Sequence, residues 1–448
     1  MRTLLAIGVL VFAAGCEQKQ PSRAQLAPKG SGEKASSYED QVGELVGYLR
    51  FTTNEYAAAV RDGQVIDKQE FDEATLMGLK PAERAWKGLS VQVGAKDAAA
   101  AKAVTEGIAA LRKLVDAKED PAKVANAVSA ISKALEGQLA GGVAPALRAT
   151  IASVRAADAD IKGEIVADDY RFGFVTFAPR PIGHYDDKGE WSAPQSAATH
   201  LLGIVVREKG TKRPLASAKV TADWGAGAVT LGPIWGDYLF YGANVALPEG
   251  NFTVKVAIEP PKICRHGDAL ASFMTEGRAE FKVTRHGAEV TVEAPRPGPV
   301  IADYRIGCDV EQAVAESIEL KEEGDYRIGF IAEGPEPIWV WESGKLVSRP
   351  AKEDDTHHLE VALFERGTNR IVMAAQVSLE MKNRTTGATR TVELHNLLSE
   401  FAHYGQTLKV DSGAYEVTVR VVPPKYGLLE EGKFRGSATA VFLWEPRS

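Results

Sequence analysis

The second half of this 448-residue chain carries the same motifs twice. Three motifs recur in the same order, and a Pro-Pro pair closes each copy at Pro260 and Pro423. Self-similarity over such a long spacing indicates a duplicated domain, so the chain is expected to fold as two similar units in tandem. The repeated motifs are DYRFGF (169–174) with DYRIGF (325–330), THLLGIVVREKGT (199–211) with THHLEVALFERGT (356–368), and FYGANV (240–245) with HYGQTL (403–408).

Both copies are predicted to be β-sandwiches. Runs such as 201–206, 252–258 and 415–422 are rich in β-branched and aromatic residues, and Gly- and Pro-containing turns separate them. The pattern places the first sandwich at 163–295 and the second at 318–448, joined by a linker at 296–317.

The region 38–160 is predicted to be a helical domain. It is rich in Ala, Leu, Glu and Lys and contains no histidine. Apolar residues recur at spacings of three and four, as in Val42, Leu45, Val46 and Leu49, which predicts helices packed as a bundle. Prolines at 81 and 121 are expected to begin helices, because the first turn tolerates proline, and about four to six helices follow.

The N-terminus predicts export and lipid attachment. Residues 1–16 combine a positive start with an apolar run that is shorter than the roughly 20 residues a membrane span needs. Small residues directly before Cys16 resemble the lipobox of bacterial lipoproteins, although Ala13 stands where leucine is usual. The resemblance implies a mature protein anchored in a membrane by lipid on Cys16, with residues 17–37 as a flexible tether. An ordinary secretory signal cleaved nearby is the alternative.

The net charge of −7 argues against a nucleic-acid partner, which would favour a basic face, and is compatible with handling cations. Of three cysteines, Cys264 and Cys308 remain once Cys16 is assigned to lipid. In an oxidising compartment this pair favours a disulfide. A free Cys264 that acts as a soft metal ligand beside His266 is the alternative.

All eight histidines lie between residues 184 and 403, within the duplicated half. His358 and Glu360 are two residues apart on a predicted strand, so both side chains point to one face. An imidazole beside a carboxylate suits copper, iron or zinc. No GxSxG, HExxH, Walker or GxGxxG motif is present, and a binding protein is therefore a better prediction than an enzyme.

The order of HLE, HYG, Pro-Pro and an RH dipeptide resembles the periplasmic proteins of high-affinity ferrous iron uptake, which are small immunoglobulin-like proteins. The resemblance implies two tandem immunoglobulin-like sandwiches after the helical bundle. It also implies a copper site formed by the two residues of HxE, a methionine, the HYG histidine and the RH histidine of a dimer partner, with iron bound nearby.

The stretch 46–74 independently resembles the extracytoplasmic helical segment of fungal-type high-affinity iron permeases. Its acidic side chains, Glu55, Asp62, Glu70 and Asp72, are expected on the solvated face of the helices. This second resemblance points to the same pathway as the first and implies a membrane iron permease as partner.

Both copies depart from the family pattern. The first has Phe240 in place of the HYG histidine, and its strand reads His200-Leu201-Leu202, so that His200 pairs with either His357 or His358. The second keeps His358, Glu360 and His403 but has no RH after its Pro-Pro pair. Neither copy has a methionine at the family's position, and His395 is the nearest substitute.

The losses in the two copies complement each other. If the fused copies keep the two-fold arrangement that the resemblance implies, His358, Glu360, His403 and His266 complete one site at the interface between the copies. The chain is then an internal pseudo-dimer that functions as a monomer, with His395, His200 and His357 as possible additional ligands. Independent decay of both copies is the alternative.

These observations predict a lipid-anchored protein of the periplasm or cell envelope that binds copper and/or iron and passes iron to a permease. A copper-dependent ferroxidase-like enzyme and a structural envelope lipoprotein with degenerate sites are the alternative hypotheses.

Overall fold

The computed structural model describes residues 38–446 except 136–137, 139–147, 187, 210–211, 226, 267–271, 298–309, 311–312, 314–316, 343 and 400. Cys16, the predicted tether and Cys308 therefore lie outside the described residues. Among the helices that are described, none has both the length and the hydrophobicity to cross a bilayer.

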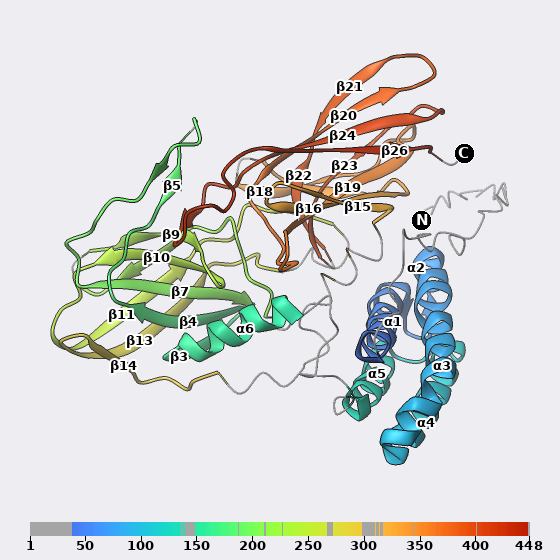
Figure 1. Ribbon diagram of the computed structural model, residues 1–448, viewed down its shortest axis with the longest axis horizontal. Helices are drawn as coiled ribbons and strands as arrows, with labels where there is room; N and C mark the ends of the chain where they lie inside the picture. The colour runs from blue at the N-terminus through green and yellow to red at the C-terminus, as the bar shows by residue number, and fades with distance from the viewer. Residues whose placement is uncertain are drawn as a thin grey trace, which may run out of the picture. The chain divides into compact units, whose positions relative to one another are not determined.

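Six α-helices form the α-helical part of the described chain (Figure 1). A short hairpin of β1 (Val60–Arg61) and β2 (Gln64–Val65) follows the first helix, and a π-helical segment (Ala74–Leu79) joins the second to the third. The helices are α1 (Tyr38–Ala59), α2 (Lys68–Glu73), α3 (Lys80–Lys96), α4 (Ala98–Asp116), α5 (Pro121–Leu135) and α6 (Arg148–Asp160).

Helices α1 to α5 bury one apolar core. Val42, Leu45, Val46 and Leu49 are at most 1% exposed, as their spacing predicts. Pro121 begins α5, whereas Pro81 lies inside one continuous helical run that includes α2, the π-helical segment and α3. The wider π-helical turn directly precedes Pro81, which cannot donate a backbone hydrogen bond, and the chain continues as helix instead of beginning a new one there.

The expectation of a wholly solvated acidic face is wrong at Glu55, which is only 3% exposed. Its carboxylate lies with those of Glu70 and Glu73 of α2, with oxygens within 4.8 Å of one another. The side chain faces α2 because α1 packs against this helix.

The first β region (163–295) forms a long antiparallel sheet in the order β14-β13-β11-β8-β9-β10-β7-β4-β3. Its two ends pack on each other, since Phe174 of β4 contacts Phe281 of β13 with ring centroids 5.3 Å apart. The strands are β3 (Gly163–Ala167), β4 (Tyr170–Phe177), β5 (His184–Tyr185), β6 (Trp191–Ser192), β7 (His200–Glu208), β8 (Val220–Asp223), β9 (Val229–Trp235), β10 (Leu239–Val245), β11 (Gly250–Ile258), β12 (Cys264–Arg265), β13 (Gly277–His286) and β14 (Glu289–Val292).

The second β region (318–446) forms two sheets, in the orders β15-β16-β19-β23-β22-β12-β17-β18 and β21-β20-β24-β26. Phe330 of β16 packs against Phe442 of β26 at 5.6 Å, which joins the two sheets. The strands are β15 (Glu319–Glu323), β16 (Tyr326–Glu333), β17 (Ile338–Glu342), β18 (Lys345–Arg349), β19 (His357–Glu365), β20 (Gln376–Asn383), β21 (Thr389–Glu393), β22 (His395–Leu398), β23 (Ala402–Leu408), β24 (Tyr415–Val422), β25 (Gly427–Leu428) and β26 (Ala438–Trp444).

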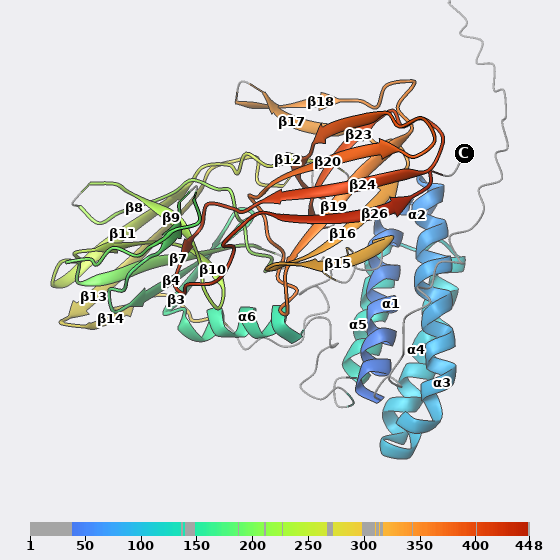
Figure 2. The ribbon, with the colours of Figure 1, turned by 45° about the horizontal axis from the view of Figure 1, so that its top comes forward.

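The two β regions exchange strands. After its Pro-Pro pair, the chain of the first region continues as β12, which lies beside β17 of the second region (Figure 2). β12 pairs antiparallel with β17 and in parallel with β22. After its own Pro-Pro pair the second region sends β25 into the first, where it pairs in parallel with β9. The repeated motifs thus lie on strands with matching neighbours in both regions.

Helix α6 packs with the strands and not with the bundle core. Ala157 is buried with Val175 and Leu201 of the first β region, and Val154 with Ile331 and Phe364 of the second. The bundle core ends at Leu135, so packing groups α6 with the β-rich half, although composition places it in the helical region 38–160.

The close approach of the π-helical segment to α1 gives a prediction for stability. A Cβ on Gly78 would lie 2.4 Å from Thr52 Oγ1 and 2.9 Å from the Thr52 backbone, so Gly78→Ala is expected to destabilise the bundle by about 1–3 kcal/mol. Gly88→Ala is the matched control in α3, where nothing lies within 4 Å, and should stabilise it by about 0.5–1 kcal/mol. Hydrogen exchange of the bundle amides measures both, and equal protection in the two variants would contradict the packing described.

Candidate metal centre

The structure brings His266, His358, Glu360 and His403 together, with ligand atoms within 4.8 Å of one another and all four side chains buried. His358 and Glu360 alternate on β19 and face the same side, and the pairing of β19 with β23 places His403 on that side as well. His266 directly follows β12, and its amide donates to Leu398 O on β22 at 3.2 Å. The exchanged strand therefore carries a side chain of the first β region into the second.

The Nε2 atoms of three imidazoles converge on one carboxylate oxygen. Glu360 Oε1 lies 3.2 Å from His358 Nε2, 3.3 Å from His403 Nε2 and 3.6 Å from His266 Nε2. His266 Nε2 and His403 Nε2 are 3.0 Å apart. Gly405 leaves the space for this arrangement, since a Cβ there would lie 2.7 Å from His358 Nε2.

Groups outside the four-residue cluster contact Nδ1 of each histidine and determine which ring nitrogen carries the proton. His403 Nδ1 lies 3.2 Å from Phe401 O, and His266 Nδ1 lies 3.1 Å from a carboxylate oxygen of Glu336. The Phe401 carbonyl only accepts, so Nδ1 of His403 donates to it. The contact between His266 and Glu336 lacks hydrogen-bond geometry, and there the negative charge of the carboxylate favours a proton on Nδ1. The hydroxyl of Thr407 donates to Glu336 O at 2.7 Å and therefore accepts from His358 Nδ1, also at 2.7 Å.

With Nδ1 protonated in all three rings, each Nε2 presents a lone pair to the centre. Two lone pairs facing each other at 3.0 Å repel unless a cation or a proton lies between them. Glu360 Oε2 is buried and accepts no hydrogen bond from the described residues. Three imidazole nitrogens and a carboxylate oxygen with free coordinating capacity fit a divalent transition metal.

The pKa values favour the metal over a proton. Burial is the main reason why the pKa of His403 is lowered to about 3; the Glu360 carboxylate opposes this shift, and the imidazoles of His266 and His358 add to it. Burial alone would raise the pKa of Glu360, but His403 and the other two imidazoles lower it to about 2. At neutral pH, His403 is therefore neutral and the carboxylate is ionised, which are the protonation states that a metal requires.

The matching position in the first β region is apolar. Glu360 pairs with Gly405 across β19 and β23, and Gly203 pairs with Gly242 across β7 and β10, so Gly203 occupies the place of Glu360. The same register aligns His200 with His357 and Leu201 with His358. Leu201 and Phe240 share a hydrophobic cluster against which Leu429, directly after β25, also packs.

The other histidines proposed as ligands lie outside the four-residue group. His200 and His357 each place Nδ1 2.9 Å from the hydroxyl of the preceding threonine, as their alignment implies. His357 packs edge-on against Trp444 on the opposite face of β19. His395 pairs with Gly405 on the strand beside the centre. Cys264 is half-buried, and because Cys308 lies outside the described residues, the disulfide stays a prediction.

Sequence reasoning missed the residues that orient the imidazoles. Glu336 lies in the loop before β17, and Thr407 lies on β23 opposite His358. No spacing in the sequence marks Glu336, because it reaches His266 only after the strand exchange. Thr407 was recognisable in principle, as the cross-strand neighbour of His358 once the register is known.

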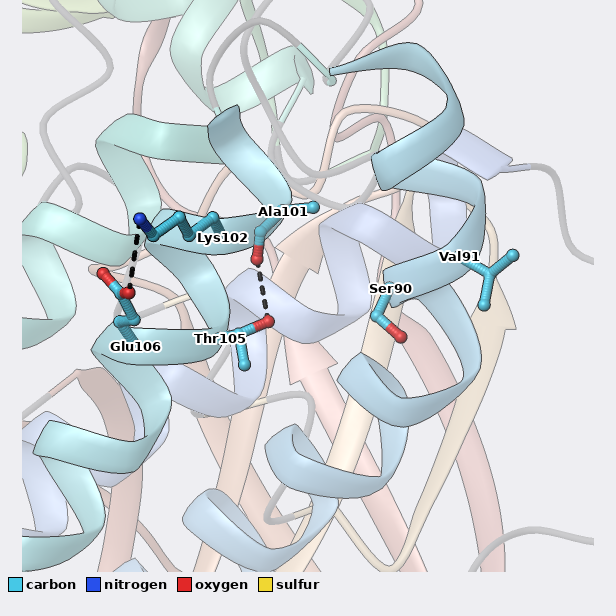
Figure 3. A pocket seen from close by; sticks show the side chains of 6 residues that line it. All are labelled: Ser90, Val91, Ala101, Lys102, Thr105 and Glu106. Carbon is cyan, nitrogen blue, oxygen red and sulfur yellow. Dashed lines mark hydrogen bonds and ion pairs between the residues drawn. The ribbon is translucent and has the colours of Figure 1, made fainter. Parts of the chain in front are cut away.

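Apart from the metal centre, a hollow with a volume of about 350 Å³ lies on the helical bundle between α3 and α4 (Figure 3). Thr105 Oγ1 donates to Ala101 O at 2.8 Å and accepts from Trp86 Nε1 at 3.0 Å. Lys102 faces Glu106 at 3.9 Å along the same helix. These polar groups bond within the bundle, so the hollow lacks the convergent unpaired groups of the buried centre.

The helical region matches a family of known proteins. Residues 31–140 match the family model described as the iron permease-associated 4-helix bundle domain. The helical region therefore contains a 4-helix bundle domain of this kind. Among curated proteins, none matches the sequence significantly.

Solved structures similar to parts of the chain include copper-binding proteins. A copper-bound variant of P19 from Campylobacter jejuni is 19% identical, with a TM-score of 0.25 over 29% of this chain and 93% of that one. Copper-reconstituted P19 is 19% identical, with a TM-score of 0.23 over 28% and 92%. A copper-bound variant of FetP from uropathogenic Escherichia coli is 17% identical, with a TM-score of 0.23 over 28% and 93%.

The lowered pKa of His403 predicts how stability depends on pH. In the unfolded chain this imidazole takes up a proton near 6.5, whereas in the folded protein it does so only near pH 3. The unfolded state thus binds more protons, and the free energy of unfolding of the metal-free protein should fall as pH is lowered from 6.5 towards 3. His403→Phe, which introduces the residue found at the matching position 240, should make this fall less steep in urea unfolding. The same slope in both proteins would contradict the assignment.

Proposed function

We propose that this protein is a lipid-anchored, extracytoplasmic metal-binding component of high-affinity iron uptake, which binds copper and/or iron and delivers iron to a membrane permease. The observation that carries the proposal is the convergence of three Nε2 lone pairs on the buried Glu360 carboxylate. Among the described residues, the ion-pair partners of Glu360 are these three imidazoles, and a bound divalent cation would neutralise the carboxylate.

The donor set favours a divalent ion. Three imidazoles and one carboxylate are borderline to hard ligands, whereas a thioether or thiolate would select cuprous copper. The group contains no sulfur, so cupric copper fits the resident position better than cuprous copper. Ferrous iron has the same preference for nitrogen and oxygen ligands and is the cargo that the iron permease-associated domain suggests.

We further propose that the two β regions arose by tandem duplication and function as an internal pseudo-dimer. The matching strand neighbours and the reciprocal exchange of β12 and β25 support this proposal. The first region supplies His266, and the second supplies His358, Glu360 and His403. The matching position in the first region is filled by Leu201 and Phe240. A monomer with one metal centre per chain follows.

Substitution of ligands from the two regions tests the centre. His266→Ala and His403→Ala should each weaken cupric copper binding by more than the roughly 10–100-fold typical of an outer partner, and the double variant should lose little more. His200→Ala is the control, because His200 lies outside the group. Copper binding by His266→Ala that equals the wild type in isothermal titration would refute the shared site.

Removal of the outer carboxylate tests the orientation of His266. Glu336→Ala removes the carboxylate that lies 3.1 Å from His266 Nδ1 and should weaken copper binding by about 10–100-fold. Glu353→Ala, which removes an exposed carboxylate before β19, is the matched control and should bind as the wild type does. Equal losses in the two variants would indicate a general charge effect.

Substitution of the lipidated residue tests the anchor. Cys16→Ala should release the protein from membranes, since a diacyl anchor contributes roughly 0.8 kcal/mol per buried methylene group. Fractionation of washed membranes measures the release. Retention of the variant in the membrane pellet would mean that attachment does not depend on Cys16.

A further inference from the structure

A second buried space, of about 60 Å³, lies where α6 and the two β regions meet, and the metal centre does not use it. At roughly 10–15 Å³ for each water, it has room for on the order of four to six waters or a small organic molecule. Thr150 and Val154 line it from α6, Arg207 from the first β region, and Met373 and Tyr426 from the second.

The wall combines apolar side chains with positive charge. Arg207, Lys212, Arg213 and Arg370 all line the cavity, and the described lining residues include no aspartate or glutamate. Arg213 pairs with Glu208 at 3.3 Å and Arg370 with Glu365 at 2.6 Å, behind the wall. Positive charge that favours an anion in a medium of low polarity therefore has to come from the part of the wall around Arg207.

Arg207 has hydrogen-bonding capacity that the protein does not use. It is 2% exposed, and its Nη2 donates to Asp158 at 2.6 Å and to Glu164 at 2.9 Å. Its Nε and Nη1 atoms, which together carry three N–H groups, have no partner among the described residues. The hydroxyl of Thr150, across the cavity wall on α6, is likewise buried and unpaired. Unpaired buried donors are costly, so an acceptor in the cavity would be stabilising.

The charges around Arg207 do not balance. Asp158 also pairs with Lys212 at 2.9 Å, and Glu164 also pairs with Arg171 at 2.8 Å. Three cations therefore share two carboxylates, which leaves one positive charge without a partner in this network. One bound carboxylate would neutralise it.

We propose that this cavity binds a small monocarboxylate with a short apolar body. The carboxylate accepts from Arg207 and Thr150, and the apolar body lies against side chains such as Val154 and Met373. The apolar wall favours an organic carboxylate over a fully hydrated inorganic oxyanion, and the volume excludes large ligands. The site is independent of the metal centre, although it lies within the same pair of β regions.

Calorimetric titration of the full-length protein with sodium isobutyrate tests the proposal. Isobutyramide has the same shape without the charge, and sodium phosphate has the charge without the apolar body. Saturable one-to-one binding of isobutyrate, with at least tenfold weaker binding of both control compounds, is the expected result. No saturable isobutyrate binding, or phosphate binding of equal strength, would overturn the proposal.

Two conservative variants locate the bound ligand. Arg207→Lys keeps the charge that pairs with Asp158 but removes Nε and Nη1, and Thr150→Val removes only a hydroxyl, so each should weaken isobutyrate binding several-fold or more. Arg171→Lys is the matched control, since Arg171 shares Glu164 but does not line the cavity. Copper titration of the same variants should match the wild type. Unchanged isobutyrate binding in both cavity variants would place the ligand elsewhere.

Discussion

The strand β12 leaves the first β region after Pro261 and joins the second by backbone hydrogen bonds with β22 and β17. Two residues are enough, because parallel pairing with β22 fixes the register and places His266 beside Leu398. A shift of one residue would turn His266 to the other face of the sheet. The position of His266 in the candidate metal centre and part of the contact between the two β regions depend on this pairing. The reciprocal pairing of β25 with β9 adds to the contact between the regions. Glu365 of the second region also accepts hydrogen bonds from Trp235 of the first region and from Lys433.

The candidate metal centre and the matching position in the first β region are filled by side chains of opposite character. The second region has His358, Glu360 and His403 at these positions, and the first has Leu201, Gly203 and Phe240 in the same order. A Cβ on Gly203 would lie 2.7 Å from Phe240 Cδ2, so the missing acidic side chain makes room for the aromatic ring. An apolar cluster needs no counter-ion, whereas a buried carboxylate among imidazoles is stable only if it is neutralised. One polar and one apolar position therefore leave the described residues of the two β regions with a single candidate metal centre.

The sequence predicted the elements whose signals are local. Strand alternation placed His358 beside Glu360, apolar spacing identified the helical core, and the complementary losses of the two copies pointed to His266 and His403 as members of one group. It did not predict the contacts between distant residues that neither a local pattern nor the repeat marks. Glu336 orients His266 across the exchanged strand, α6 packs with the β regions, and Glu55 is buried against α2. Alignment alone also left open whether His200 matches His357 or His358, and the pairing register was needed to decide for His357.

If the proposed centre is correct, one metal ion is bound per chain by residues of both β regions. Anomalous diffraction from crystals of the copper-loaded protein, measured at the copper absorption edge, tests it most directly. We expect one strong anomalous peak per chain, within coordinating distance of Nε2 of His266, His358 and His403 and of the Glu360 carboxylate. A peak beyond coordinating distance of His266, or a second peak of equal height at the matching position beside Phe240, would contradict this expectation.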